Sequence, residues 1–164
     1  MVCSALGKKI KMTCLTNFHL TFAPLSVNEV YQLADNGSNG AIVLMSGTVR
    51  DQTEGKPVKY LEYQAYEPMA IKVFQQISDD IMEKWPDTNS IIIHHRIGKL
   101  TIKDISVLVA VGCPHRGEAF SACQYAIDTL KHNAPIGKKN ILMMALVVGL
   151  ALVCVSNILS RFTS

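Results

Sequence analysis

Basic side chains that could bind an anion occur at three places in this sequence, each next to an apolar segment. They are Arg50 in SGTVRD, His115 and Arg116 in GCPHRGEAF, and Lys131, Lys138 and Lys139 in LKHNAPIGKKN. The planar guanidinium of arginine suits phosphate and carboxylate groups, and a helix that begins after the His-Arg pair would add unpaired N–H groups. Neighbouring cations lower the pKa of a lysine, so its amine can serve as a general base or nucleophile. The sequence therefore predicts a basic, phosphate-binding pocket formed by three loops, without identifying the reaction.

Each of these segments also has an explanation that needs no ligand. Arg50 could be a surface arginine at a strand end, the turn with His115 and Arg116 a solvated loop, and a lysine at a helix C-terminus a partner of the helix dipole. His94 and His95 alternate in direction along an expected strand, so at most one is expected to face inward. A core or surface position is favoured over metal binding, because no acidic or cysteine residue stands at ligand spacing.

Length and composition favour one folded domain without a disulfide framework. The chain has 164 residues, of which 49% are hydrophobic, and its net charge of +3 comes from basic residues spread along the chain. This distribution argues against a general nucleic-acid binder. The five cysteines include no C-x-x-C pair, so neither a zinc site nor a disulfide set is expected. A reducing compartment fits best, with Cys113 and Cys123 acting as small buried hydrophobic residues.

The hydrophobic patterning predicts an α+β domain in which pairs of strands alternate with helices. Helices are expected at about 26–35, 68–85 and 117–131, buried or half-buried strands at 41–50, 59–66, 90–98 and 105–112, a mobile loop at 51–57 and a connection at 99–104. Ser26 with Glu29 three residues on is a capping-box pattern, and Pro68 begins a helix where its missing N–H costs nothing. The residues predicted to face the core from the second and third helices are Met69, Val73, Phe74, Ile77, Ile81, Ala119, Phe120, Ala122, Cys123, Ala126, Ile127 and Leu130.

Several longer motifs, in one order from about residue 20 to residue 139, carry a resemblance to a known family. They are GAIVLMSGTVRD, LEYQAYEPMA, KWP, HRIG, PHRGEAF and YAIDTLKxxAPIxKK. In this order and spacing they closely resemble the large, catalytic subunit of molybdopterin synthase. The resemblance implies an α/β-hammerhead fold, in which a mixed sheet packs with helices.

The resemblance also implies a reaction in molybdenum cofactor biosynthesis. In that family, cyclic pyranopterin monophosphate (precursor Z) receives two sulfurs and becomes the dithiolene of molybdopterin. The sulfur arrives as a thiocarboxylate on the C-terminal glycine of a small ubiquitin-like carrier subunit, so no cofactor is expected. The usual assembly is a heterotetramer around a central homodimer of large subunits, and the expected location is the cytosol.

The basic residues named above match functional positions of that family. Lys131 and Lys138 match lysines implied to be catalytic. Lys131 would meet the C-terminus of the carrier, and Lys138 would support sulfur transfer. The residues implied to bind the substrate are Arg50, His115, Arg116 and Lys139. The resemblance implies no metal ligand.

The chain departs from the family pattern towards its C-terminus. Gly137 stands where the family usually has tryptophan, and Asn140 stands where it usually has glutamate. A polar segment with another tryptophan, which helps to build the pocket in the family, is replaced by apolar residues. These departures predict a pocket that is less completely closed. They motivate an alternative function, a catalytically impaired or membrane-tethered variant that only binds the carrier subunit or dimerises.

These observations divide the chain into three parts. Residues 1–19 lack the apolar core of a secretory signal and are expected to be a disordered extension. Residues 20–140 form the expected catalytic-subunit domain. Residues 141–164 form an apolar tail, whose uncharged stretch 141–159 is long enough to span a bilayer. The tail is interpreted as a membrane anchor, as a variant end that replaces the native one, or as a buried core helix.

Overall fold

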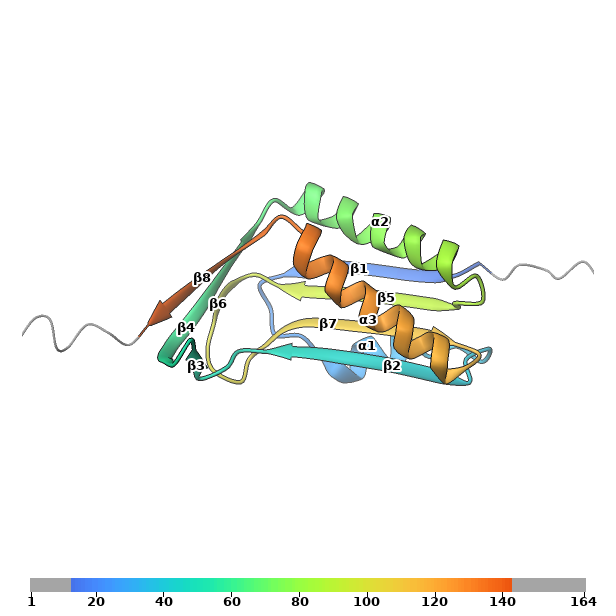
Figure 1. The fold of residues 1–164 in the computed structure, drawn as a ribbon, viewed down its shortest axis with the longest axis horizontal. Coiled ribbons are helices and arrows are strands. Elements are labelled where there is room, and N and C mark those ends of the chain that lie inside the picture. The colour runs from blue at the N-terminus through green and yellow to red at the C-terminus, as the bar shows by residue number, and fades with distance from the viewer. Residues whose placement is uncertain (1–12, 143–164) are drawn as a thin grey trace, which may run out of the picture.

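Residues 13–142, the part of the chain that this computed structural model describes, form three helices and eight strands. In chain order they are β1 (Leu15–Thr21), α1 (Val27–Ala34), β2 (Ala41–Thr48), β3 (Gln52–Thr53), β4 (Lys56–Ala65), α2 (Glu67–Lys84), β5 (Ser90–Arg96), β6 (Gly98–Leu100), β7 (Ile105–Cys113), α3 (Arg116–Asn133) and β8 (Ile136–Leu142). The strands form two four-stranded sheets, which we call the larger and the smaller sheet because the first contains more residues. The smaller sheet lies at one end of the larger one (Figure 1). The predicted α+β fold class, with a mixed sheet packed against helices, is confirmed.

The larger sheet contains four strands in the order β1-β5-β7-β2. β1 runs parallel to β5, whereas the pairs β5–β7 and β7–β2 are antiparallel. α2 and α3 pack side by side on one face of this sheet, and α1 covers the other (Figure 1). The inner strands β5 and β7 are therefore buried on both faces, which explains their continuous apolar and β-branched runs. β2, predicted to be buried, is half-exposed because it lies at the edge of the sheet.

The core-facing stripes of α2 and α3 follow the predicted periodicity with two exceptions. The buried apolar residues are Ala70, Phe74, Ile77, Ile81, Ala119, Ala122, Cys123, Ala126, Ile127 and Leu130. Met69 and Phe120 were predicted to face the core, but they are 52% and 62% exposed. Each is the direct neighbour of an alanine that faces the sheet, and a helix turns roughly 100° per residue. In the first turns of both helices, the small alanines Ala70 and Ala119 therefore contact the sheet, and the larger side chains beside them point to solvent.

Helix termini form where the local sequence signals place them. The Ser26 hydroxyl accepts a hydrogen bond from the backbone N–H of Glu29, with an N···O distance of 3.3 Å, so the predicted cap of α1 is confirmed. Pro68 lies in the first turn of α2, and Trp85 follows its last residue. α3 ends just before Pro135. These four boundaries depend on neighbouring residues alone, which is why the sequence predicted them.

The smaller sheet is built around β4, which pairs with β3, β6 and β8. Since β6 and β8 both pair with residues 61–63, they lie on opposite edges of β4. The predicted mobile loop at 51–57 is instead a hairpin of β3 and β4, with Glu54 and Gly55 at positive φ in its two-residue turn. The predicted connection at 99–104 begins with part of β6, and the segment 136–142, predicted to be mainly loop, is β8.

The boundaries of the domain also differ from the prediction. Residues 15–19, predicted to be disordered, belong to β1, whose residue Phe18 packs edge-on against Phe74 with ring centroids 6.3 Å apart. The parallel partner β5 lies far away in the sequence, so no local pattern marks this pairing. Residues 141–142 of the predicted tail belong to β8. The predictions for 1–12 and 143–164 lie outside the described residues. Within residues 13–142, no helix is both long and apolar enough to cross a membrane.

A hydrogen-bonded cluster ties the end of α1 to the larger sheet. The Ser90 hydroxyl and the Asn39 side-chain amide both donate to the backbone carbonyl of Ala34, at 2.8 and 2.9 Å. Gly112 on β7 leaves the room for this cluster, because a Cβ at that position would overlap Ser90 Oγ and the Asn39 amide nitrogen. The glycine is therefore required by a close approach of side chains.

We expect Gly112→Ala to lower the free energy of unfolding by about 2 kcal/mol, because overpacking must displace this cluster. Equilibrium urea unfolding followed by circular dichroism measures the change. Gly117→Ala is the matched control, since a Cβ at Gly117 would meet no atom within 4 Å. Equal stability of the two variants would contradict the role given to Gly112.

Candidate functional site

A cavity of about 530 Å³ opens where the smaller sheet meets the C-terminal end of α3. We call it the basic cavity, and the lining residues that bear on its chemistry are Arg50, Tyr63, His95, Ser106, Lys131 and Lys138. Three of the predicted site residues are thus brought together from separate segments. Arg50 follows β2, Lys131 lies in the last turn of α3, and Lys138 lies on β8.

Sheet pairing decides which side chains of β8 enter the basic cavity. Lys138 lies opposite Tyr63 of β4, and Ile136 and Lys138 both line the cavity. Successive side chains of a strand point to opposite faces, so Gly137 and Lys139 belong to the other face. Lys138, predicted to lie on a loop, is therefore held in position by the backbone hydrogen bonds of the smaller sheet.

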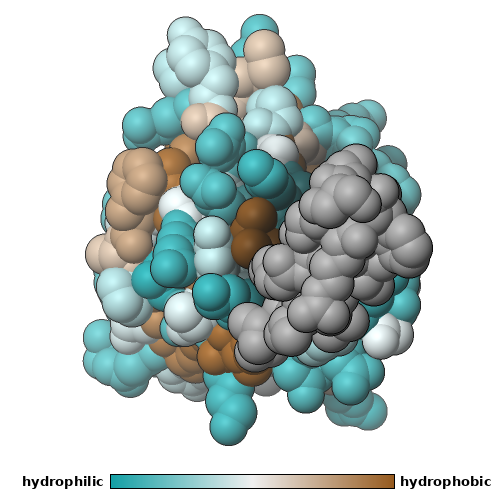
Figure 2. All heavy atoms as spheres, turned by 90° about the vertical axis from the view of Figure 1, so that its left-hand side faces the viewer, coloured by the Kyte–Doolittle hydropathy of each residue, from teal (hydrophilic) through white to brown (hydrophobic). Residues whose placement is uncertain are grey.

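Lys139 lies on the outer face of the smaller sheet. It is paired with Glu62, whose partner on the opposite edge is Lys99. Lys99 Nζ lies 4.4 Å from the ring centroid of Tyr60, which contributes to the same face. Hydrophilic side chains dominate the visible part of this end of the molecule (Figure 2). The structure therefore does not bring Lys139 into the basic cavity, although the sequence prediction grouped it with Lys138.

Gly137 also lies on the outer face, opposite Gln64. A Cβ at this position would meet the Gln64 backbone oxygen at 3.6 Å, an ordinary van der Waals contact. A larger side chain here would therefore extend over the outer face rather than into the cavity. The expectation that glycine at 137 opens the pocket does not follow from the described part of the structure.

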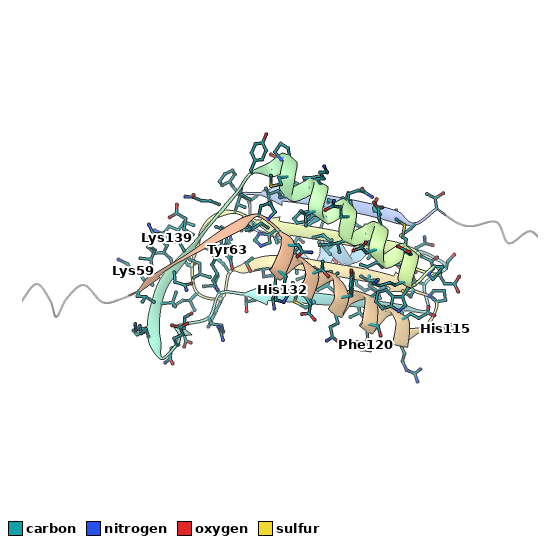
Figure 3. The ribbon with its side chains drawn as sticks, turned by 45° about the horizontal axis from the view of Figure 1, so that its top comes forward. Lys59, Tyr63, His115, Phe120, His132 and Lys139 are labelled. Atoms are coloured by element: carbon teal, nitrogen blue, oxygen red, sulfur yellow. The ribbon has the colours of Figure 1, made fainter. Side chains whose placement is uncertain are left out.

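His115 and Arg116 lie at the other end of α3 from the basic cavity; Figure 3 labels His115 at this end. At 1.5 Å per helical residue, Arg116 and Lys131 are roughly 22 Å apart along the helix axis. The pair lines a separate hollow with Gly40 and Pro114. The predicted single pocket formed by three loops is therefore wrong within one subunit, because α3 holds two of the three segments apart.

Both histidines of β5 are buried, whereas the sequence predicted that at most one would face inward. His94 and His95 are 3% and 5% exposed, and they point to opposite faces of a sheet that helices cover on both sides. His94 Nε2 lies 2.7 Å from Asn17 Oδ1 on the α1 side. His95 lines the basic cavity. The one sequence feature that pointed to His95 was its place in the HRIG motif. The sequence did not show that helices cover both faces of the strand on which it lies.

The floor of the basic cavity is polar but neutral. The Nδ1 of His95 lies 2.8 Å from the carbonyl oxygen of Arg96, and burial lowers the pKa of the imidazole to about 4. The Tyr63 ring packs edge-on against it with ring centroids 5.2 Å apart, and burial raises the pKa of Tyr63. The Ser106 hydroxyl donates to the carbonyl oxygen of Gly47 at 3.0 Å. Sequence reasoning missed these three side chains because each lies within a strand.

The arrangement suits an anionic ligand bound over a neutral floor. Guanidinium and ammonium groups donate hydrogen bonds to phosphate or carboxylate, and partial enclosure strengthens these contacts. Within residues 13–142, no three His, Cys, Asp or Glu side chains are close enough to hold a metal ion. The buried thiols Cys113 and Cys123 have raised pKa values caused by burial, which fits the small hydrophobic role predicted for them.

Comparison with known proteins identifies one family. A family model described as MoaE protein matches residues 20–133. A molybdopterin synthase catalytic subunit from Nostoc sp. is 67% identical over 123 residues, which cover 75% of this chain and 74% of the relative. A protein of the same name from Staphylococcus aureus (strain Mu50) is 45% identical over 127 residues, which cover 77% of this chain and 85% of the relative.

Solved structures of similar proteins share the fold. The crystal structure of molybdopterin synthase from Staphylococcus aureus matches 77% of this chain and 91% of its own, with a TM-score of 0.73 and 44% identity. A Burkholderia ambifaria MoaE protein matches 83% of this chain and 96% of its own, with a TM-score of 0.68 and 27% identity. A Helicobacter pylori complex of subunits 1 and 2 of molybdopterin-converting factor matches 81% of this chain and 92% of its own, with a TM-score of 0.62. At 20% identity, this last match supports the fold alone.

Stability is expected to fall below pH 6.5 because His95 is held neutral. Its pKa is about 4 in the folded protein and ordinarily 6.5, so the unfolded chain binds the proton more readily. The contribution of neutral His95 to the free energy of unfolding is therefore fully present above pH 6.5 and is lost as the pH falls towards 4. At pH 5 this loss is about 2 kcal/mol. Urea unfolding at pH 7 and pH 5 measures the loss. His95→Gln, which does not titrate, should show a smaller loss; an identical pH dependence would contradict the assignment.

Proposed function

This chain belongs to the MoaE family, and we propose that it acts as the catalytic subunit of molybdopterin synthase, an enzyme of molybdenum cofactor biosynthesis. The observation that carries the proposal is the convergence of Arg50, Lys131 and Lys138 on one cavity. The substrate is cyclic pyranopterin monophosphate, and the product is molybdopterin. No bound cofactor takes part, because the sulfur comes from a carrier subunit.

The basic cavity offers the interactions that this sulfur transfer needs. Both reactants are anionic, one as a phosphate ester and the other as a thiocarboxylate, so each requires cations in a partly enclosed site. Arg50 can hold a phosphate through two parallel hydrogen bonds. Lys131 and Lys138 meet the thiocarboxylate end of the carrier and stabilise charge as the carbon–sulfur bond forms. Each transfer forms one carbon–sulfur bond on the substrate and breaks a carbon–oxygen bond at the same carbon, so a substrate oxygen leaves. Water then hydrolyses the thioester to the carrier, which ends as a carboxylate, and a lysine amine can move the accompanying protons.

Assembly with a small carrier subunit and with a second copy of this chain is part of the proposal. The Helicobacter pylori structure is a complex of subunits 1 and 2 of molybdopterin-converting factor. A homodimer also explains how His115 and Arg116 can contribute to the site, although α3 holds them roughly 22 Å from Lys131. In one subunit they cannot reach the same small substrate. In a two-fold dimer, the pair from one subunit can complete the cavity of the other.

We place the protein in the cytosol. The cysteines of the described part of the chain, Cys14, Cys113 and Cys123, are free thiols, which fits a reducing compartment. A thiocarboxylate carrier is itself sensitive to oxidation, so its acceptor is expected in the same compartment.

Reconstitution tests the proposed function. Purified full chain, thiocarboxylated carrier and cyclic pyranopterin monophosphate should yield molybdopterin, measured as its fluorescent oxidation product. Lys138→Ala is expected to lower the rate at least about 100-fold, because it removes a cation and a proton donor from the reacting centre. Lys139→Ala, its neighbour on the outer face, should keep most of the activity. No product from the wild-type chain with an active carrier would overturn the function, and equal losses in both variants would overturn the assignment of Lys138.

A subunit-mixing experiment tests the composite site. Lys138→Ala and Arg116→Ala subunits, inactive alone, should recover about a quarter of wild-type activity when exchanged in equal amounts. Half of the dimers are then mixed, and one of their two sites is intact. Mixing Lys131→Ala with Lys138→Ala is the control, because both residues line the same cavity and no site is restored. No recovery in the first mixture would show that Arg116 does not act across the dimer.

A further inference from the structure

The Nε2 atom of His95 forms no hydrogen bond with the described part of the chain. Its Nδ1 lies 2.8 Å from the carbonyl oxygen of Arg96, and a carbonyl can only accept a hydrogen bond. Nδ1 therefore carries the proton, and in the neutral imidazole Nε2 has the free lone pair. Burial keeps the ring neutral by lowering its pKa. Nε2 is thus an acceptor and not a donor.

The free nitrogen of His95 is accessible to solvent, and His95 lines the basic cavity. Within residues 13–142, Ser78 Oγ and Glu118 Oε2 are the buried polar side-chain atoms that lack a hydrogen-bond partner. No described residue forms a hydrogen bond with Nε2 of His95. If this atom were buried, it would belong to the same group as Ser78 Oγ and Glu118 Oε2, but it does not. It therefore keeps access to solvent, and the residue lines the cavity. An acceptor placed in this way is available to a ligand.

His95 supplies what the charged residues of the cavity cannot. Arg50, Lys131 and Lys138 only donate hydrogen bonds, so they recognise the anionic part of a ligand. The Ser106 hydroxyl already donates its proton to the backbone of β2. An N–H or O–H of the ligand that reaches the floor needs an acceptor, since a buried donor without a partner is costly.

We propose that His95 Nε2 accepts a hydrogen bond from an N–H or O–H group of the substrate and so selects a ligand that combines an anion with a hydrogen-bond donor. This inference rests on the proposed function and refines it. The cations bind the phosphate, and His95 distinguishes the pyranopterin from an anion that has no N–H or O–H group. His95 is a binding residue of the floor, and the edge-on Tyr63 ring fixes the plane of its imidazole.

His94 is a matched control in the same strand. It is also buried, but it lies on the α1 face of the sheet, where its Nε2 is paired with Asn17. His94→Leu and His95→Leu therefore remove similar buried side chains, and only the second changes the cavity. His95→Gln retains an acceptor oxygen near the position of Nε2 and guards against the loss of folding in the leucine variant.

Equilibrium binding of two ligands to the full chain tests the inference. We expect His95→Leu to weaken the binding of cyclic pyranopterin monophosphate about 10-fold, the effect of leaving one buried donor unpaired. Sulfate, which carries no proton at neutral pH, should bind the wild type and His95→Leu equally, because it can contact the cations alone. His95→Gln should recover part of the affinity, and His94→Leu should bind both ligands as the wild type does.

Nitrogen NMR of the imidazole gives an independent readout. In protein labelled with ¹⁵N-histidine, the unprotonated Nε2 resonance of His95 should shift towards lower frequency when the pyranopterin is added, and should not shift with sulfate. Unchanged pyranopterin affinity in a folded His95→Leu variant, with a wild type that forms molybdopterin, would overturn this inference alone. If His95→Leu does not fold, an Nε2 resonance of the wild type that stays in place when the pyranopterin binds would overturn it instead. A parallel loss of sulfate binding would also overturn it, since His95 would then act through the cations. A wild type that does not bind the pyranopterin would overturn both proposals.

Discussion

The antiparallel pairing of β8 with β4 is the constraint on which the site depends. It continues the chain from the end of α3 into the smaller sheet, and its two-residue period sends Lys138 inward and Lys139 outward. A slip of one residue would exchange these two lysines. Backbone hydrogen bonds therefore decide which of two identical side chains lines the basic cavity. The same period places Gly137 outside the cavity, so a difference from the family at that position leaves the described cavity walls intact.

The larger sheet gives the cavity its rigid floor. Its inner strands are covered by α1 on one face and by α2 and α3 on the other, so a polar residue on either face is buried. His95 is held by this double burial, by the hydrogen bond to its neighbour's carbonyl and by the ring of Tyr63 from the smaller sheet. The Tyr63–His95 contact is where the two sheets meet beneath the cavity. The cavity thus combines cations at the ends of long side chains with a neutral imidazole that is held by a hydrogen bond and a ring contact.

Local signals predicted much of the fold. The cap at Ser26, the proline at the start of α2 and the apolar stripes of both long helices depend on neighbouring residues, and the structure agrees with them. The prediction failed where an element depends on a distant partner. β1 pairs with a strand that lies far along the chain, and β8 reads as a polar loop because both of its lysines look solvated. Three of the basic residues chosen by type, Arg50, Lys131 and Lys138, line one cavity, but the grouping of all of them into a single pocket was wrong.

The sequence by itself determined the α+β class, the helix boundaries, the family and the set of basic side chains from which a site could be made. These properties depend on residue type, on periodicity and on motifs, which are all written along the chain. The tertiary structure decided which of these side chains share a cavity. Strand register separated Lys138 from Lys139, and the length of α3 separated Arg116 from Lys131. Burial on both faces of the larger sheet placed His95 in the lining of the basic cavity. Each of these outcomes depends on the distance between segments that only the folded chain brings together.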